Sequence, residues 1–199
     1  MAIRLNPKSV SICGCRLLCL FLLLGLLLPD WSTAADQMPL AEHQLQALYL
    51  YNLTKYMEWP ADAFNNTNAP FTIGLMAGPE LRRDLEEITR GKEINGRHIE
   101  VRSIAQPQEA KACQLIFLES GDKQQWAPIL NATKVAPVLP VGVSDDFIRS
   151  GGVICFARKD NKLRLKIDLN AARRARFSVS AKLMAVAEDV SDQRKGSSN

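Results

Sequence analysis

Four short apolar runs, separated by segments with helical character, constrain the fold of this chain more than any other feature. The apolar runs lie at residues 71–76, 99–104, 115–118 and 136–143, and Pro140 interrupts the last of them. The segments that follow them predict helices at residues 79–90, 108–112, 121–133 and 145–150. This alternation predicts an α/β fold, a single-domain layered structure in which a largely parallel sheet is flanked by helices. The 199 residues, 47% of them hydrophobic, are sufficient for one such domain.

The C-terminal third departs from this alternation and predicts a β-hairpin. Residues 152–158 and 163–169 are two strand-like runs joined by a polar turn at residues 159–161. In the second run, alternation places four apolar residues inward and three polar ones outward: Leu163, Leu165, Ile167 and Leu169, against Arg164, Lys166 and Asp168. Asn170 is expected to cap the helix that follows. Residues 181–190 predict a last helix, capped by Ser178 or Ser180, and residues 191–199 a flexible tail.

The first helix, predicted over residues 39–57, is apolar on more than one side. It holds all three tyrosines of the chain. Trp59 lies just after it, directly before Pro60, which ends the helix. Core packing explains such aromatic residues, and so does a protein interface, where Tyr and Trp are enriched. The helix therefore lies deep in the domain or buries its second face in another chain, and a homodimer through it is one alternative.

The N-terminus predicts an export signal. Basic residues precede an unbroken apolar run at residues 17–28, and small residues after it suit cleavage behind Ala34 or Ala35. The run is short for a membrane span, so a retained anchor is the weaker alternative. We therefore expect residues 1–35 to be a signal peptide, residues 36–190 a single α/β domain, and the mature protein to be soluble in the periplasm.

Charge and composition argue against a nucleic-acid partner. Loss of the signal removes Arg4, Lys8, Arg16 and Asp30, which lowers the net charge from +4 to about +2, and only 7% of the residues are aromatic. Nucleic-acid binding needs a denser basic surface. A partner of this chain is expected to be recognised by shape and apolar contact rather than by a strong field.

Few residues suggest chemistry. The sequence lacks the common nucleophile, metal and nucleotide motifs, and we expect no catalytic residue, metal site or cofactor. Asp145 and Asp146 suit an acid–base pair or metal ligands, but a helix cap is the simpler interpretation. The signal peptide contains three of the five cysteines, so Cys113 and Cys155 form either one disulfide or two buried thiols.

Several segments together resemble one family. They include Tyr-Met-Glu-Trp-Pro at residues 56–60, Phe-Thr-Ile-Gly-Leu at 71–75, Cys-Gln-Leu-Ile-Phe at 113–117 and Ile-Asp-Leu-Asn-Ala-Ala at 167–172. The chain is similar over about residues 45–188 to the YfiR-like family of bacterial periplasmic proteins. The best-studied members carry four cysteines in two disulfides, a pattern from which this sequence departs.

The resemblance implies a non-enzymatic regulator that binds the periplasmic sensor region of an inner-membrane diguanylate cyclase and lowers cyclic-di-GMP. It also implies an outer-membrane partner that can sequester the regulator. Tyr51 and Trp59 of the first helix, with Arg173 and Arg176 near the C-terminus, are the candidate contact residues.

Other functions remain open from the sequence. One is an adaptor for another membrane receptor or a histidine kinase. Another is a receptor whose small ligand lies at the carboxyl ends of the parallel strands. The last is an enzyme that uses Asp145, Asp146 or His98.

Overall fold

The computed structural model of the protein describes residues 41–160 and 162–191. Its helices are α2 Glu42–Tyr56, the 3-10 helix η1 Ala61–Ala63, α3 Pro79–Thr89, α4 Pro107–Ala110, α5 Lys123–Thr133, α6 Asp145–Arg149, α7 Leu169–Arg174 and α8 Ala181–Met184. Its strands are β1 Met57–Glu58, β2 Phe71–Met76, β3 Glu93–Ile94, β4 Arg97–Ser103, β5 Leu115–Leu118, β6 Leu139–Gly142, β7 Ile154–Lys159, β8 Lys162–Ile167, β9 Ser178–Val179 and β10 Ala187–Asp189. The predicted signal peptide and residues 192–199 of the predicted tail lie outside the described residues.

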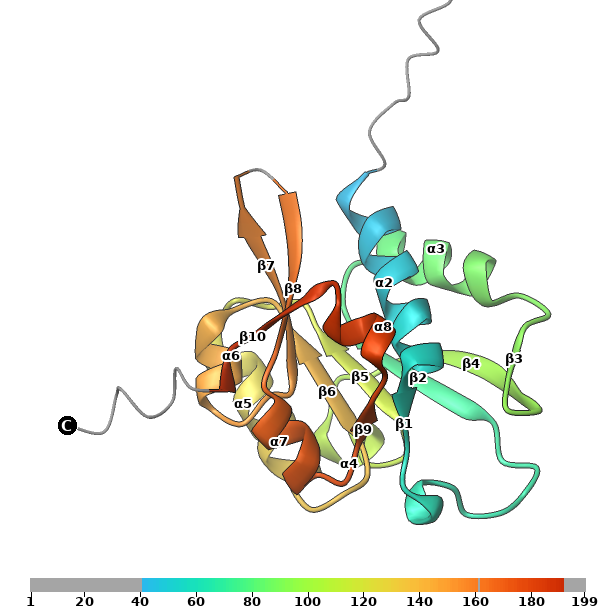
Figure 1. Ribbon diagram of the computed structural model, residues 1–199. Helices are drawn as coiled ribbons and strands as arrows, with labels where there is room; N and C mark the ends of the chain where they lie inside the picture. The colour runs from blue at the N-terminus through green and yellow to red at the C-terminus, as the bar shows by residue number, and fades with distance from the viewer. Residues whose placement is uncertain (1–40, 161, 192–199) are drawn as a thin grey trace, which may run out of the picture. The chain divides into compact units, whose positions relative to one another are not determined.

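Eight strands form one mostly parallel sheet, in the order β10-β8-β7-β6-β5-β2-β4-β3 (Figure 1). The five central strands, from β7 to β4, are parallel to one another. β8 returns antiparallel to β7, β3 is antiparallel to β4, and β10 runs parallel to β8 at the edge. The predicted α/β fold with a largely parallel sheet and a C-terminal hairpin is therefore confirmed.

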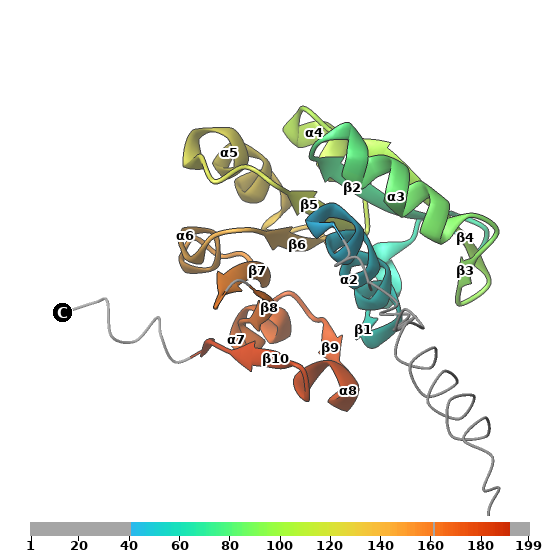
Figure 2. The same cartoon turned by 90° about the horizontal axis from the view of Figure 1, so that it is seen from above.

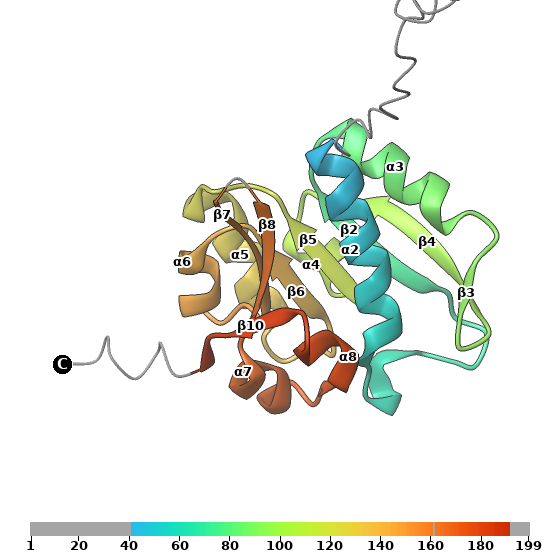
Figure 3. The ribbon, with the colours of Figure 1, turned by 45° about the horizontal axis from the view of Figure 1, so that its top comes forward.

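Helices cover both faces of the sheet because its central strands are apolar on both sides. Leu115 and Phe117 of β5 belong to the hydrophobic cluster that includes residues of α2 and α3. Ile116 and Leu118 belong to a second cluster, which includes residues of α4, α5 and α6. Figure 3 shows α2 lying along one face of the sheet with α3 beside it. Strands buried on both faces are continuous apolar runs, which is why β2 and β5 have the predicted bounds.

The junction between β8 and α7 differs from the prediction. Asp168 does not point outward, since it is fully buried and its carboxylate accepts the backbone amide of Ala171 at 2.7 Å. It is therefore the N-cap of α7, and Asn170, the predicted cap, lies inside the helix. The strand ends at Ile167, one residue before the alternation breaks.

Two further predictions at the C-terminal half are wrong in detail. Pro140 does not interrupt its strand: β6 passes through it, and its carbonyl accepts the amide of Val153 at 3.3 Å. Residues 181–190 do not form one helix, because α8 ends at Met184 and the next residues form β10 against β8. Ser180 caps α8, as one of the two predicted alternatives.

The segment that follows the C-terminal end of α2 pairs with the segment that follows α7. β1 and β9 form a short antiparallel pair that aligns Met57 with Val179 and Glu58 with Ser178. The amide of Ser180 also donates to the carbonyl of Tyr56 at 2.9 Å. Figure 2 shows α2, β1, β9 and α8 gathered in one region of the fold. The pairing brings together two of the regions that the sequence predicts as contact sites.

Candidate functional site

Tyr51 of α2 is a core residue. Its side chain is 8% exposed, and the ammonium groups of Lys55 and Lys92 lie 4.0 and 4.5 Å from the centre of its ring. These two cations cover the ring face, an arrangement that stabilises the tyrosine where it is. Tyr51 therefore offers little surface to a partner, and its side chain packs in the hydrophobic core that α2 shares with the sheet.

Trp59 holds the exit of α2 against the sheet. Its indole N–H donates to the carbonyl of Gln114 at 2.8 Å. The ring meets Phe71 edge-on, with centroids 4.8 Å apart, and meets Phe177 at 5.8 Å. Edge-to-face aromatic contacts of this kind add to the apolar area that they bury. Trp59 thus joins β2 to the segment that follows α7, and it is only partly exposed.

Arg173 and Arg176 are both exposed at the end of α7. The guanidinium of Arg176 donates to Asp62 at 2.7 Å, and that of Arg173 donates to Asn170 at 3.3 Å. Arg176 has a backbone φ of 63°, a left-handed conformation that non-glycine residues seldom adopt. The helix ends two residues earlier, at Arg174, and the chain turns at Arg176 toward β9.

The exposed residues around this junction form a surface that we call the β1–β9 surface. It consists of Glu58, Asp62, Arg173, Arg176 and Ser178. Trp59 lies beneath it through its contact with Phe177. The structure thus brings Trp59 and Arg176 to one region, with Arg173 three residues earlier on α7, whereas Tyr51 is buried elsewhere in α2. The sequence contains no signal for Asp62, because its pairing with Arg176 spans 114 residues.

The two cysteines of the domain are free thiols in separate hydrophobic clusters. Cys113 packs against β2, where a side chain at Gly74 would lie 2.7 Å from its sulfur. Cys155 is fully buried on β7 beside Ile148 and Val190. Burial raises the pKa of Cys113 to about 11 and that of Cys155 to about 12, so both are protonated at neutral pH. Of the two alternatives from the sequence, this structure has the buried thiols.

The residues considered for enzyme chemistry have neighbours of their own among the polar side chains. Asp145 accepts from Lys166 at 2.8 Å, and Asp146 pairs with Arg149 within α6. His98 lies 3.6 Å from a carboxylate oxygen of Glu100. Ser144, rather than either aspartate, caps α6. Within residues 41–160 and 162–191, no group of three or more His, Cys, Asp or Glu side chains is arranged to hold a metal ion.

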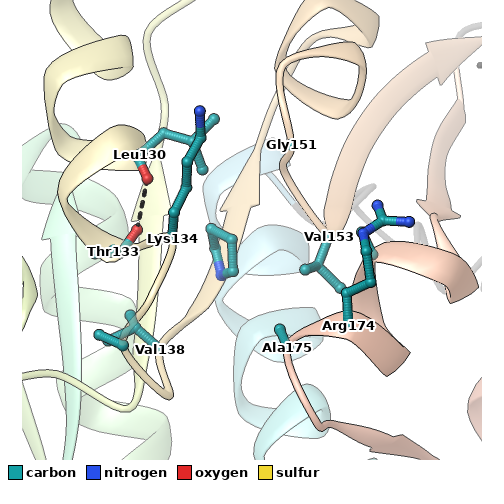
Figure 4. Close-up of a pocket in the computed structure, with 11 residues that line it drawn as sticks. Leu130, Thr133, Lys134, Val138, Gly151, Val153, Arg174 and Ala175 are labelled. Carbon is teal, nitrogen blue, oxygen red and sulfur yellow. Dashed lines mark hydrogen bonds between the residues drawn. The ribbon is translucent and has the colours of Figure 1, made fainter.

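A pocket of about 320 Å³ lies between the end of α5 and the end of α7 (Figure 4). Leu130 and Thr133 line one side, and Val153 and Ala175 the other. The hydroxyl of Thr133 donates to the carbonyl of Leu130 at 3.0 Å, so its polar atom is satisfied by its own helix. The pocket borders Pro140 near the start of β6 and Val153 before β7, which places it at the amino ends of these strands. The alternative of a small-ligand receptor, which the sequence left open, predicted a ligand at the carboxyl ends instead.

Comparison with known proteins covers curated sequences, solved structures and protein-family profiles. The comparison with curated protein sequences found no match. Among solved structures, an ABC domain in complex with L-Trp from Streptococcus pneumonia has a TM-score of 0.47 and 10% identity over 74% of this chain. A conserved domain protein from Vibrio cholerae O1 biovar eltor has a TM-score of 0.44 and 11% identity over 75% of this chain. The chain spans 59% and 60% of the lengths of these two proteins.

The part of the chain that the structure describes holds no helix long and apolar enough to cross a membrane.

The profile of the YfiR/HmsC-like family matches residues 43–188, which run from the first turn of α2 to β10 and include the whole β1–β9 surface. The family resemblance inferred from the sequence segments is thus confirmed, and the chain belongs to the YfiR/HmsC-like family.

Proposed function

We propose that this protein is an exported periplasmic regulator that binds the sensor region of an inner-membrane signalling protein and represses a diguanylate cyclase. The observation that carries the proposal is the family match over residues 43–188, since proteins of the YfiR-like family are regulators of this kind. The predicted signal peptide at residues 1–35 agrees with such a location. An outer-membrane partner that sequesters the regulator belongs to the same proposal.

The mechanism requires only a difference in affinity. A regulator that binds one conformation of a membrane sensor better than another shifts the sensor toward that conformation. A coupling free energy of about 1–3 kcal/mol corresponds to an effect of about 5- to 150-fold. No chemical step in the regulator is needed, and the ion pairs that Asp145 and Asp146 form agree with a binding role.

We assign the partner contact to the β1–β9 surface. Arg173 and Arg176 supply exposed guanidinium groups, which pair with carboxylates in a two-pronged geometry. Trp59 fixes this surface on the core through Phe71 and Phe177. Tyr51 acts indirectly, by holding α2 in place.

A homodimer through α2 also remains a proposal. Its apolar contact is Leu48, which is 41% exposed on that helix. Light scattering at micromolar concentration tests the homodimer.

The test is crosslinking in intact cells of a C-terminally tagged protein, followed by solubilisation of the membranes and identification of what is recovered. We expect an inner-membrane cyclase with a periplasmic sensor region. Arg173→Glu and Arg176→Asn should each lower its recovery by about tenfold, the loss expected when a well-placed interface arginine is removed. Asn tolerates a positive φ, so the second variant removes the charge without straining the backbone.

Arg83→Glu is the matched control, because Arg83 is an exposed arginine on α3, outside the β1–β9 surface. It should leave recovery unchanged. Equal recovery with all three variants would rule out the β1–β9 surface as the contact. Recovery of a histidine kinase or another receptor would replace the cyclase as the partner.

A further inference from the structure

The pocket between α5 and α7 has apolar walls. They are formed by Leu130, Ala136, Val138, Pro140, Val153, Ala171 and Ala175. The lining contains no acidic side chain, and the one hydroxyl is bonded to its own helix. Its volume of about 320 Å³ falls at the lower end of the range for small-molecule sites. Such walls favour the apolar body of a small ligand.

Two cations lie at the edge of this pocket. Lys134 follows the last residue of α5, and Arg174 is the last residue of α7 (Figure 4). Both are exposed, and no carboxylate among the described residues lies within 4.0 Å of either charged group. The stem of Lys134 extends along Gly151, whose missing side chain would lie 3.8 Å from the lysine Cε. Two unpaired cations beside an apolar hollow favour an anionic head on the ligand.

We infer that this pocket binds a small amphiphilic anion, a monocarboxylate with an aliphatic or aromatic body. The body occupies the apolar walls, and the carboxylate lies between Lys134 and Arg174 at the mouth. Burial of the body supplies most of the affinity, and the two cations select the charge of the head. The inference is independent of the membrane partner, because every residue that it uses belongs to this chain.

A second role for the two cations is to complement the negative ends of α5 and α7, where Lys and Arg are favourable without any ligand. This role predicts effects on stability alone. It gives no reason for an apolar hollow to lie between the cations. The experiment therefore measures ligand binding and thermal stability separately.

The link to regulation rests on the proposed function. α7 carries Arg174 at the pocket and Arg173 on the β1–β9 surface, one residue apart. A bound anion therefore contacts the helix that presents the proposed partner contact, and it is expected to stabilise one position of that helix. Ligand binding itself is measured on the purified protein without a partner, so it can fail or succeed independently of the regulator function.

The test is an NMR titration of the purified protein with octanoate, with 1-octanol and octylammonium as probes of the same apolar body. Octanoate should saturate and shift the amides at the end of α5 and along α7. Octanol and octylammonium should bind at least fivefold more weakly. Lys134→Gln and Arg174→Gln should each weaken octanoate binding by about two- to fivefold, the range for partly exposed ion pairs, and leave octanol binding unchanged.

Two further variants complete the experiment. Ala136→Leu fills the pocket and should abolish octanoate binding while the fold is retained. Arg173→Gln is the matched control: it removes a guanidinium from the same helix outside the pocket and should not change octanoate affinity. Equal binding of octanoate and octanol would overturn the inference. So would a loss of thermal stability in Arg174→Gln without a change in affinity, or shifts located away from α5 and α7.

Discussion

At the scale of single residues, the carboxylate of Asp168 fixes the junction between β8 and α7. It is fully buried and accepts the amide of Ala171 at 2.7 Å, which satisfies a donor of the first helical turn. The amide of Asp168 donates to the carbonyl of Val153 at 2.9 Å, so the same residue also holds the start of β7. This residue positions α7, and with it both the pocket and the β1–β9 surface.

Asp168→Ala should lower the free energy of unfolding by about 2 kcal/mol, since it removes a buried cap and leaves the amide of Ala171 without its acceptor. Urea denaturation measures this change. Ser180→Ala, which removes the cap of the four-residue helix α8, should cost less, about 1 kcal/mol. Equal denaturation midpoints for Asp168→Ala and the unchanged protein would contradict the assigned role.

The two cysteines connect stability to alkaline pH. Burial raises the pKa of Cys113 to about 11 and of Cys155 to about 12, from an ordinary value of 9.0. The folded protein therefore retains these protons over a range in which the unfolded chain loses them. The stability that comes from the protonated thiols is complete below pH 9 and is lost as the pH rises from 9 toward 11 or 12.

The unfolding free energy should consequently fall between pH 8 and pH 10. The double variant Cys113→Ala/Cys155→Ala should lose less stability over the same interval, because two of the titrating groups are absent. Urea denaturation at the two pH values measures both proteins. An identical loss in the two proteins would show that other groups account for the pH dependence.

At the scale of elements, the ring of Phe147 anchors α6, because it packs directly against the backbone of Gly142 and Gly152. A side chain built at Gly142 of β6 would lie 2.5 Å from the ring of Phe147, and one at Gly152 would lie 2.3 Å from it. Phe147 also meets Trp126 of α5, with ring centroids 5.3 Å apart. These contacts join α5, α6 and the centre of the sheet in one cluster.

Gly142→Ala should destabilise the protein by about 2 kcal/mol, because the new methyl group overlaps the buried ring of Phe147. Gly121→Ala is the control, since no atom lies within 4 Å of a side chain built there. Its unfolding free energy should change little. The packing described for Phe147 would be refuted by thermal unfolding curves in which the two variants behave alike.

The sequence predicts an element well when local pattern decides it. β2 and β5 were predictable because strands buried on both faces are unbroken apolar runs. β10 was not, because Ala187–Asp189 become a strand only through pairing with Leu165–Ile167 of β8, a contact between distant parts of the chain. Asp168 was misplaced for a related reason: strict alternation was extended two residues past the end of β8, into the cap and the first residue of the next helix.

At the scale of the whole molecule, the family was predictable and the site only partly so. The segments at residues 56–60 and 167–172 pointed to the family that the profile match then gave. The grouping of Trp59 with Arg176 depends on the β1–β9 pairing. Tyr51 is buried, whereas Trp59 is partly exposed, and this difference depends on tertiary packing that the sequence does not reveal. The pocket was not predictable, because its lining comes from three separate stretches of the chain, at residues 130–140, 151–153 and 171–175.

The central claim is that this protein acts from the periplasm to lower the output of a diguanylate cyclase. The most direct test measures intracellular cyclic-di-GMP in cells that lack the protein and in cells that regain it. Loss of the protein should raise cyclic-di-GMP, and the full chain should restore the lower level. A chain without residues 1–35 and the Arg173→Glu variant should both fail to restore it. An unchanged cyclic-di-GMP level after loss of the protein would contradict the account.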